Sequence, residues 1–270
     1  MTDILQDLSA DNLIRAIEDN LANCIPLFSK IGEVKVNDPP GLKRVISDVP
    51  IPFFNSVVEA KLEPEQVHVA IQAVMADAKA HKVPVLWWVG PSSRPVDLPD
   101  QLTRSGFTLA DDSPGMAVVL ADLNEDLPTP KGLEIRPALD DNSWWAWCQA
   151  MSEGFGIPPD LEFFSTAWHD LLKVMDAEIA SAYIAWLDGT PVATSLLLLG
   201  GGVAGIYGVA TVPAARRKGI GAQITLHPLR EARAKGYQAG VLEASEMGER
   251  VYRALGFQTY CRIRSYRYRP

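Results

Sequence analysis

Residues Gly208–Ala222 read GVATVPAARRKGIGA and mark the passage from a strand to a long helix. The apolar run Val203–Thr211 predicts a strand that stops at Pro213, because proline cannot donate a hydrogen bond to a central β-ladder. A basic loop with two glycines follows, and then a helix is expected over Lys218–Lys235, closed by Gly236. This strand, loop and helix decide how the C-terminal half is interpreted.

The loop itself has the properties of an anion site. The first turn of a helix carries unpaired N–H groups and the positive end of the helix dipole. Gly219 and Gly221 lack a Cβ atom, so a phosphate can approach the main chain closely, and Arg216, Arg217 and Lys218 add positive charge at the rim. The loop suits a pyrophosphate, although it matches neither the P-loop pattern nor the dinucleotide pattern G-x-G-x-x-G. A solvated basic corner is the alternative that these residues leave open.

The surrounding sequence predicts a mixed α/β sheet with helices on both faces. Asp188-Gly189 is typical of a hairpin turn, and the segment around it is rich in strands. One or two strands are expected over Gln258–Arg269. The other expected elements are strands at Leu133–Pro137, Ala180–Trp186, Val192–Leu199 and Gln238–Ala244, and helices at Asp141–Gly154, Pro159–Val174 and Glu246–Leu255.

Two motifs in this half resemble those of the GNAT superfamily of acetyl-CoA-dependent N-acyltransferases. The first is Arg/Gln-x-x-Gly-x-Gly/Ala opening a helix, preceded by Val-x-Thr-x-Pro, and the second is Tyr-x-x-x-Gly-Phe on the next helix. The resemblance covers residues 131–270 and includes the order of strands and helices. The matching residues are Arg216, Gly219 and Gly221, then Val209, Thr211 and Pro213, and finally Tyr252, Gly256 and Phe257.

The resemblance implies transfer of an acetyl or other short acyl group from acyl-CoA to a primary amine of a small molecule or peptide. Main-chain groups of Val209, Ala210 and Thr211 would bind the pantetheine arm, and the Val209 N–H would stabilise the oxyanion. Tyr252 would protonate the departing thiolate, since a tyrosine is protonated at neutral pH. The amides expected to hold the pyrophosphate are those of Arg216, Arg217, Lys218, Gly219, Ile220, Gly221 and Ala222.

The general base is less well defined, because members of the family use varied carboxylates. Glu243, on the strand beside the donor site, is the candidate we adopt; Tyr207, Glu153 and Glu162 are alternatives. Each of them can also be explained as a packing or pocket residue. The four histidines have no metal-ligand spacing, so no metal is expected. The tryptophans at 144, 145, 147 and 168 are expected to pack in the core, with the lining of an acceptor pocket as the alternative.

The N-terminal half is expected to be a degenerate copy of the same fold, or else an unrelated α/β domain. Its helix Pro64–Ala80 corresponds to Lys218–Lys235, but the residues that lead into it, Ala60–Glu65, contain two acids and no glycine pair. We therefore expect a domain without a CoA phosphate site over 1–122, a linker over 123–131 and the catalytic domain over 132–270. One acyl-CoA per chain follows from this division.

Composition excludes some classes of function. The net charge of −8 argues against a nucleic-acid binder. The charge is unevenly distributed, since residues 1–130 hold 10 Lys and Arg against 19 Asp and Glu, whereas residues 131–270 hold 15 against 14. No apolar run is long enough to span a membrane, and the acidic start has no signal core, so a cytoplasmic protein is expected. A non-catalytic acyl-CoA-binding or regulatory module and, less well supported, an interaction scaffold are the competing hypotheses.

Overall fold

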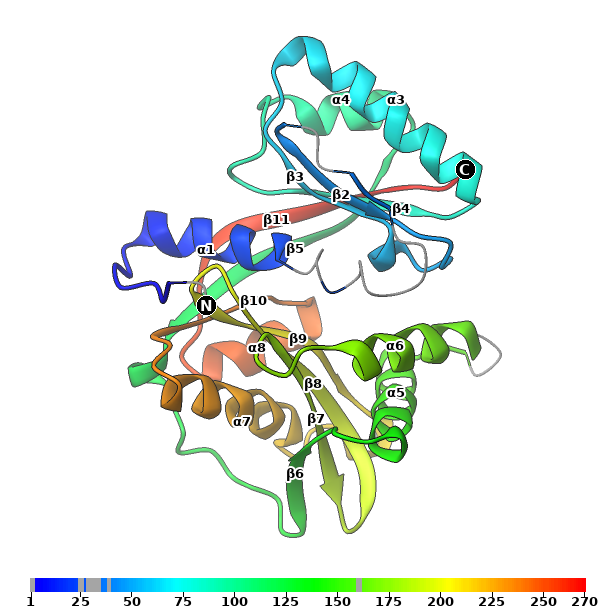
Figure 1. Ribbon diagram of the computed structural model, residues 1–270. Coiled ribbons are helices and arrows are strands. Elements are labelled where there is room, and N and C mark those ends of the chain that lie inside the picture. Colours follow the sequence, from blue (N-terminus) through cyan, green and yellow to red (C-terminus); the bar gives the residue numbers. More distant parts are fainter. Residues whose placement is uncertain (1–2, 24–26, 28–34, 38–39, 159–161) are drawn as a thin grey trace. The chain divides into compact units, whose positions relative to one another are not determined.

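The computed structural model describes residues 3–23, 27, 35–37, 40–158 and 162–270 (Figure 1). These residues form a mixed α/β structure, as expected, and divide into two compact units. Unit 1 consists of the chain up to Asn20 together with Met116–Tyr260, and unit 2 consists of Leu21–Gly115 with Cys261–Pro270. Strands β5 (Thr108–Val119) and β11 (Gln258–Tyr268) each contribute residues to both units.

The sheet of unit 1 is antiparallel from β6 to β9 and parallel between β9 and β10. Helices α5 and α6 lie on one side of β7, β8 and β9, and α7 lies on the other (Figure 1). The helices are therefore on both faces, as the sequence predicted. The strands are β6 (Leu133–Pro137), β7 (Ala180–Leu187), β8 (Thr190–Gly200), β9 (Val203–Thr211) and β10 (Ala239–Glu243); the helices are α5 (Asp141–Phe155), α6 (Glu162–Val174), α7 (Ile220–Ala234) and α8 (Glu246–Ala254).

Helix α7 continues through a proline. Pro228 has no N–H to donate to the carbonyl of Ile224, one turn earlier in the helix. The buried Ser195 hydroxyl of β8 donates to that carbonyl instead, at 2.9 Å from Oγ to O. A side chain from the sheet thus satisfies a group that the helix itself leaves unpaired.

The N-terminal helix is tied to the β8–β9 hairpin by one buried side chain. Asn20 Nδ2 donates to the carbonyls of Gly200 at 2.8 Å and Leu198 at 3.2 Å, and Asn20 Oδ1 accepts from the Tyr207 hydroxyl at 2.8 Å. A Cβ atom at Gly205 would lie 1.9 Å from Asn20 Oδ1, so only glycine leaves room there. The start of the chain is therefore part of unit 1.

Unit 2 contains the second parallel strand pair. Strands β1 (Lys35–Asn37), β2 (Leu42–Ile46) and β3 (Ser56–Ala60) pair antiparallel, β3 pairs parallel with β4 (Val85–Val89), and β4 pairs antiparallel with the end of β11. The rings of Trp87 and Phe107 meet edge to face at 6.0 Å in its core. Its helices are α3 (Pro64–His81) and α4 (Leu98–Arg104).

Two predicted elements need correction. The apolar periodicity of residues 3–24 predicts a helix over that whole stretch, but the helix is α1 (Ala10–Ala22), and Asp7 accepts from the Ser9 N–H in a turn ahead of it. The run Phe53–Leu62 predicts a strand of that length, but the strand is shorter, because Pro52–Phe54 forms a 3₁₀ turn before β3. The C-terminal segment is one strand, β11. The prolines expected to open α6 include Pro159, which lies outside the described residues.

The compact units do not follow the linear order of the chain. Segment 123–131, expected to be a linker, lies along α7, where Glu125 forms ion pairs with Arg230 at 2.7 Å and Arg233 at 2.6 Å. Nearer the start of α7, Gln223 Nε2 donates to the Leu127 carbonyl at 3.1 Å. As a division into independently folding domains, the limits 1–122 and 132–270 stay a prediction.

Candidate active site

Strands β9 and β10 separate near the centre of unit 1. Their pairing, within the described residues, covers Ala204 with Gly240 and Gly205 with Val241. Beyond these pairs β9 continues beside β8 as far as Thr211, and β10 leads to Glu243. Beyond Gly205, the main chain of β9 is therefore paired with β8 on one side and has no paired residue of β10 on the other, within the described residues.

A bulge lies at the point where the strands part. Leu196 pairs with Tyr207 and Thr194 with Ala210, so Gly208 and Val209 together face the single residue between the two pairs on β8. Gly208 has a φ of +56°, and a Cβ atom there would lie 3.4 Å from the Trp147 ring. The Thr194 hydroxyl donates to the Gly208 carbonyl at 2.8 Å. The positive φ favours glycine at 208, whereas a Cβ atom there would make only an ordinary van der Waals contact with the tryptophan ring.

The loop before α7 leaves a row of amides open. The Arg216 N–H donates to the Pro213 carbonyl at 3.3 Å and the Ala222 N–H to the Gly219 carbonyl at 3.2 Å. Between these two, the amides of residues 217–221 have no acceptor among the described residues. Arg217, with a φ of +60°, and Gly219, with a φ of +81°, both adopt the left-handed conformation. A main chain that changes between right-handed and left-handed conformations from one residue to the next turns successive N–H groups toward a common point, as in anion-binding nests.

The three basic side chains of this loop have different environments. The guanidinium of Arg216 donates to the Thr211 carbonyl from Nε at 3.0 Å and to the Gly154 carbonyl from Nη2 at 2.8 Å. Arg217 and Lys218 are exposed. The Arg216 side chain therefore connects parts of the protein, whereas the other two can screen a bound anion.

Tyr252 lies on α8, the helix that follows β10. Ser245 caps the helix by accepting from the Gly248 N–H. The Tyr252 side chain is buried, with its ring edge to face with Phe257 at 6.0 Å between centroids. Burial raises the pKa of Tyr252 to about 12, so that its hydroxyl is protonated at neutral pH.

Glu243 ends β10, on the strand that leads away from β9. Burial of its carboxyl group raises the pKa of Glu243 to about 7. A carboxylate with a pKa near the working pH is well suited to accept a proton, since it is substantially ionised and still basic. No pattern of neighbouring charges in the sequence signals this shift, because it comes from desolvation.

The alternative bases are placed less favourably. The Tyr207 hydroxyl donates its proton to Asn20 Oδ1, and Glu153 is exposed in the last turn of α5. Glu162 begins α6, and its side chain lies outside the described residues. Glu243, whose pKa is raised toward neutrality by desolvation, stays the candidate that we adopt for the base.

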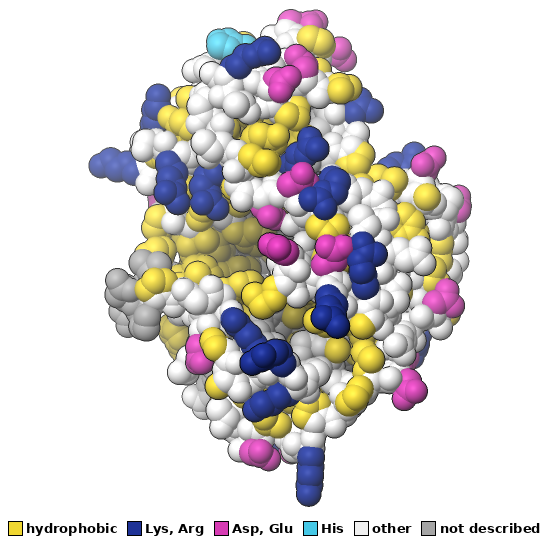
Figure 2. Space-filling model, turned by 180° about the vertical axis from the view of Figure 1, so that it is seen from behind, with side chains coloured by type: hydrophobic (Ala, Val, Ile, Leu, Met, Phe, Trp, Pro, Cys, Tyr) yellow, Lys and Arg dark blue, Asp and Glu magenta, His cyan; other side chains and the backbone are white. Residues whose placement is uncertain are grey.

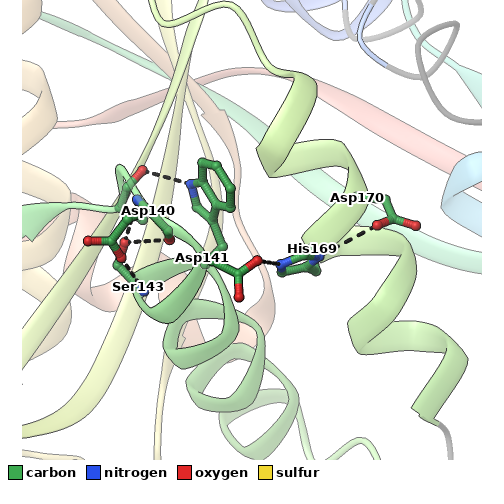
Figure 3. A network of polar contacts seen from close by, with 7 residues as sticks. Asp140, Asp141, Ser143, His169 and Asp170 are labelled. Carbon is green, nitrogen blue, oxygen red and sulfur yellow. Dashed lines mark hydrogen bonds and ion pairs between the residues drawn. The ribbon is translucent and has the colours of Figure 1, made fainter.

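Helices α5 and α6 are joined by a polar network that the sequence did not signal. His169 Nε2 lies 2.9 Å from Asp141 Oδ1 and its Nδ1 lies 3.5 Å from Asp170 Oδ1, so that two carboxylates flank the ring (Figure 3). Asp140 caps α5 by accepting from the Ser143 N–H. The Trp145 ring stacks on His169 at 4.3 Å. The network fixes α6 against the start of α5.

The tryptophans of these helices are mainly packing residues. Trp147 is fully buried and donates from Nε1 to the Ser195 carbonyl at 3.2 Å, and its ring lies 5.6 Å from that of Trp168. Trp144 donates to the Ala138 carbonyl at 3.1 Å. Trp145 keeps 39% of its surface exposed. This arrangement agrees with the expectation of core packing for Trp147 and Trp168.

Side-chain charge does not single out the site. Figure 2 shows basic and acidic side chains interspersed with apolar ones over the face it presents. In the part of the chain that the structure describes, there is no group of His, Cys, Asp and Glu arranged to hold a metal ion. No described helix is long and apolar enough to cross a membrane. The main chain at the start of α7 is the distinguishing feature.

The comparisons with known proteins agree with this geometry. Residues 142–257 match the Acetyltransferase (GNAT) family. The whole chain is similar in structure to a GCN5-related N-acetyltransferase from Kribbella flavida, with a TM-score of 0.69, 21% identity and coverage of 92% of this chain and 93% of that chain. No curated protein is significantly similar in sequence.

A second similar structure shows that both halves share the fold. A tandem GNAT protein from the clavulanic acid biosynthesis pathway matches with a TM-score of 0.60 and 14% identity over 97% of this chain and 96% of that chain. The fold is that of a tandem GNAT acetyltransferase. Residues 142–257 are the part of the chain that matches the GNAT family.

Proposed function

We propose that unit 1 transfers an acetyl or other short acyl group from acyl-CoA to a primary amine of a small molecule or peptide. The observation that carries the proposal is the row of open amides over residues 217–221, at the start of α7. Such a row, with the positive end of the helix dipole behind it, fits the pyrophosphate of CoA. The exposed side chains of Arg217 and Lys218 add charge beside it.

The separation of β9 from β10 supports a place for the pantetheine arm. Residues Val209–Thr211 lie beyond the last pair with β10, so an extended ligand can bind their main chain as an added strand. The bulge at Gly208 and Val209 changes the direction of the strand at that point. We propose the Val209 N–H as the donor to the oxyanion that forms at the thioester carbonyl.

Two titratable residues supply the proton transfers in this proposal. Glu243, with its pKa near 7, takes a proton from the attacking amine, directly or through water. Tyr252, with its pKa near 12, gives a proton to the CoA thiolate as it leaves. The base thus has the lower pKa and is ionised near neutral pH, whereas the acid has the higher pKa and is protonated.

Acetyl-CoA titration and turnover test the proposal separately. Calorimetry of the whole chain with acetyl-CoA should give binding with one site per chain, and a panel of primary amines should release CoA thiol. Binding without thiol release across a broad panel would favour the alternative of a non-catalytic acyl-CoA-binding module. The absence of both heat and thermal shift with acetyl-CoA would reject the enzyme and the binding module together.

A further inference from the structure

The residue that begins the phosphate loop also contacts the helix on the other side of β9. Arg216 Nε donates to the carbonyl of Thr211, at the end of β9, and Nη2 donates to the carbonyl of Gly154, in the last turn of α5. The side chain is half-buried, so these two bonds form partly out of solvent. One guanidinium therefore spans the donor strand and a helix more than fifty residues earlier in the chain.

The contact between α5 and β9 is close as well as polar. A Cβ atom at Gly154 would lie 2.7 Å from the Ala210 Cβ and 3.1 Å from the Thr211 nitrogen. The last turn of α5 thus rests directly on the main chain proposed to bind pantetheine. Trp147, two turns earlier on α5, packs beside the bulge at Gly208. The helix follows β9 from the bulge to its end.

We propose that Arg216 is a positioning residue that couples the acyl-CoA loop to α5, and through α5 to the acceptor side of the site. This inference rests on the proposed function of unit 1. The guanidinium holds α5 in register with Ala210 and Thr211, so an acyl-CoA bound along β9 also fixes α5, the helix that this proposal assigns to the acceptor. Arginine suits this task because its planar fork reaches two carbonyls at once.

Substitution of Arg216 should give different results if it is a direct phosphate ligand and if it is a positioning residue. If Arg216 positions α5, Arg216→Ala should leave the Kd for acetyl-CoA close to wild type while kcat/KM for the amine falls about tenfold or more, since small misplacements in an active site are costly. Lysine at this position can reach one carbonyl only, so kcat/KM of Arg216→Lys for the amine should lie between the values of wild type and Arg216→Ala. Gly154→Ala, which displaces α5 from the opposite partner, should reproduce the loss of kcat/KM.

Lys218→Ala is the matched control. It removes the same charge from an exposed neighbour, and we expect weaker acetyl-CoA binding with little change in the acceptor KM. A tenfold weaker Kd in Arg216→Ala, with an unchanged acceptor KM, would show that Arg216 is a phosphate ligand and would overturn the proposal.

Hydrogen exchange tests the coupling without turnover. Amides in the last turn of α5 should exchange faster in Arg216→Ala than in wild type, and acetyl-CoA should slow their exchange in wild type but not in the variant. A wild type that bound acetyl-CoA while α5 exchange stayed the same in both proteins would reject the coupling alone. A wild type that bound no acetyl-CoA would reject the proposed function and the coupling with it.

Discussion

The two units contain the same strand, loop and helix, and they differ in whether the main chain at the junction is open. In unit 2, β3 pairs in parallel with β4 at Ser56 with Leu86 and Val57 with Trp87. In unit 1, β9 pairs in parallel with β10 through two residue pairs in the same way. In each unit the inner strand then leads through a short loop into a long helix, α3 or α7.

The end of β3 is occupied by the protein itself. The Arg94 N–H donates to the Ala60 carbonyl at 2.8 Å, and the Leu62 N–H donates to the Arg94 carbonyl at 3.3 Å. The Lys61 N–H donates to the Gly41 carbonyl at 2.6 Å. The loop after β4 therefore takes the position beside β3 that we propose for pantetheine beside β9.

The start of α3 is also closed to an anion. Glu63 and Gln66 form a capping box, in which the Gln66 side-chain oxygen accepts from the Glu63 N–H at 3.0 Å. Glu65 adds a second carboxylate in the first turn. Helix α7 has Gly219 as its N-cap and no acid in its first turn. A helix start binds a phosphate only where its amides are open and no carboxylate of its own lies beside them.

The largest effect is expected from a substitution that blocks the open amides at the start of α7. In Gly221→Glu, bulk and negative charge are placed at the proposed phosphate site, and we expect acetyl-CoA binding to disappear in calorimetry. A Cβ atom at Gly221 would meet only Thr211 Oγ1, at 3.7 Å, so Gly221→Ala should fold normally and serves as the control. Because unit 2 is closed, no residual binding should remain. A residual site of one per chain would show that unit 2 binds acyl-CoA after all.

Removing the proposed acid should affect turnover and spare binding. In Tyr252→Phe the buried ring is kept, and kcat should fall about 100-fold, the usual contribution of a general acid. The Kd for acetyl-CoA, measured by calorimetry, should stay near the wild-type value. An equal loss of binding and turnover would mean that Tyr252 is needed for packing and not for proton transfer.

The pH profile sharpens the role of Glu243. Because a base must be ionised, kcat/KM of the wild type should rise as pH increases through about 7. Glu243→Gln should lower kcat/KM about tenfold or more at pH 8 and remove this rise. An unchanged profile in the variant would assign the base to another group.

The raised pKa of Glu243 also affects the stability of the folded protein. A carboxyl group with a raised pKa binds more protons in the folded state, so the free energy of unfolding should fall as pH rises from about 4.5 to about 7. Denaturant unfolding of wild type and Glu243→Gln over this range measures the effect. The variant should lack that part of the decrease.

The smallest expected effect concerns the helix behind the open junction. Unlike α3, α7 contains an internal proline, and Ser195 compensates for it. Ser195→Ala leaves the buried Ile224 carbonyl unpaired and should lower the free energy of unfolding by about 1–3 kcal/mol. In the double variant Ser195→Ala with Pro228→Ala, the helix supplies its own N–H and most of this loss should be recovered. Denaturant unfolding of the three proteins tests this.

Strand and helix limits near strong local signals were predictable. Strands β6 and β9 match the predicted limits, and the other elements from β7 to α8 differ from theirs by a few residues. Proline, glycine and capping residues act within one turn, so their effects can be recognised in a short window of sequence. The capping of α5 by Asp140 is an example, because Asp and Asn are favoured at the N-cap and the sequence there reads Asp140-Asp141-Asn142.

The features that define the site depend on contacts between distant segments. The sequence predicted amides from Arg216 to Ala222, but the structure shows that the first and last of these already have acceptors. It gave no sign that the Arg216 side chain would reach Gly154, or that Asn20 would hold Tyr207. Such partners are chosen by packing, which a local pattern does not contain.

By itself, the sequence determined that the C-terminal half has a basic, glycine-containing loop between a strand and a long helix, and that the matching loop in the N-terminal half is acidic. Only the tertiary structure decided which amides stay open, that burial brings the pKa of Glu243 to about 7, and that Arg94 closes the end of β3. The physical reason is that charge and backbone conformation are local properties of a sequence, whereas desolvation and hydrogen-bond partners depend on what folds against each group.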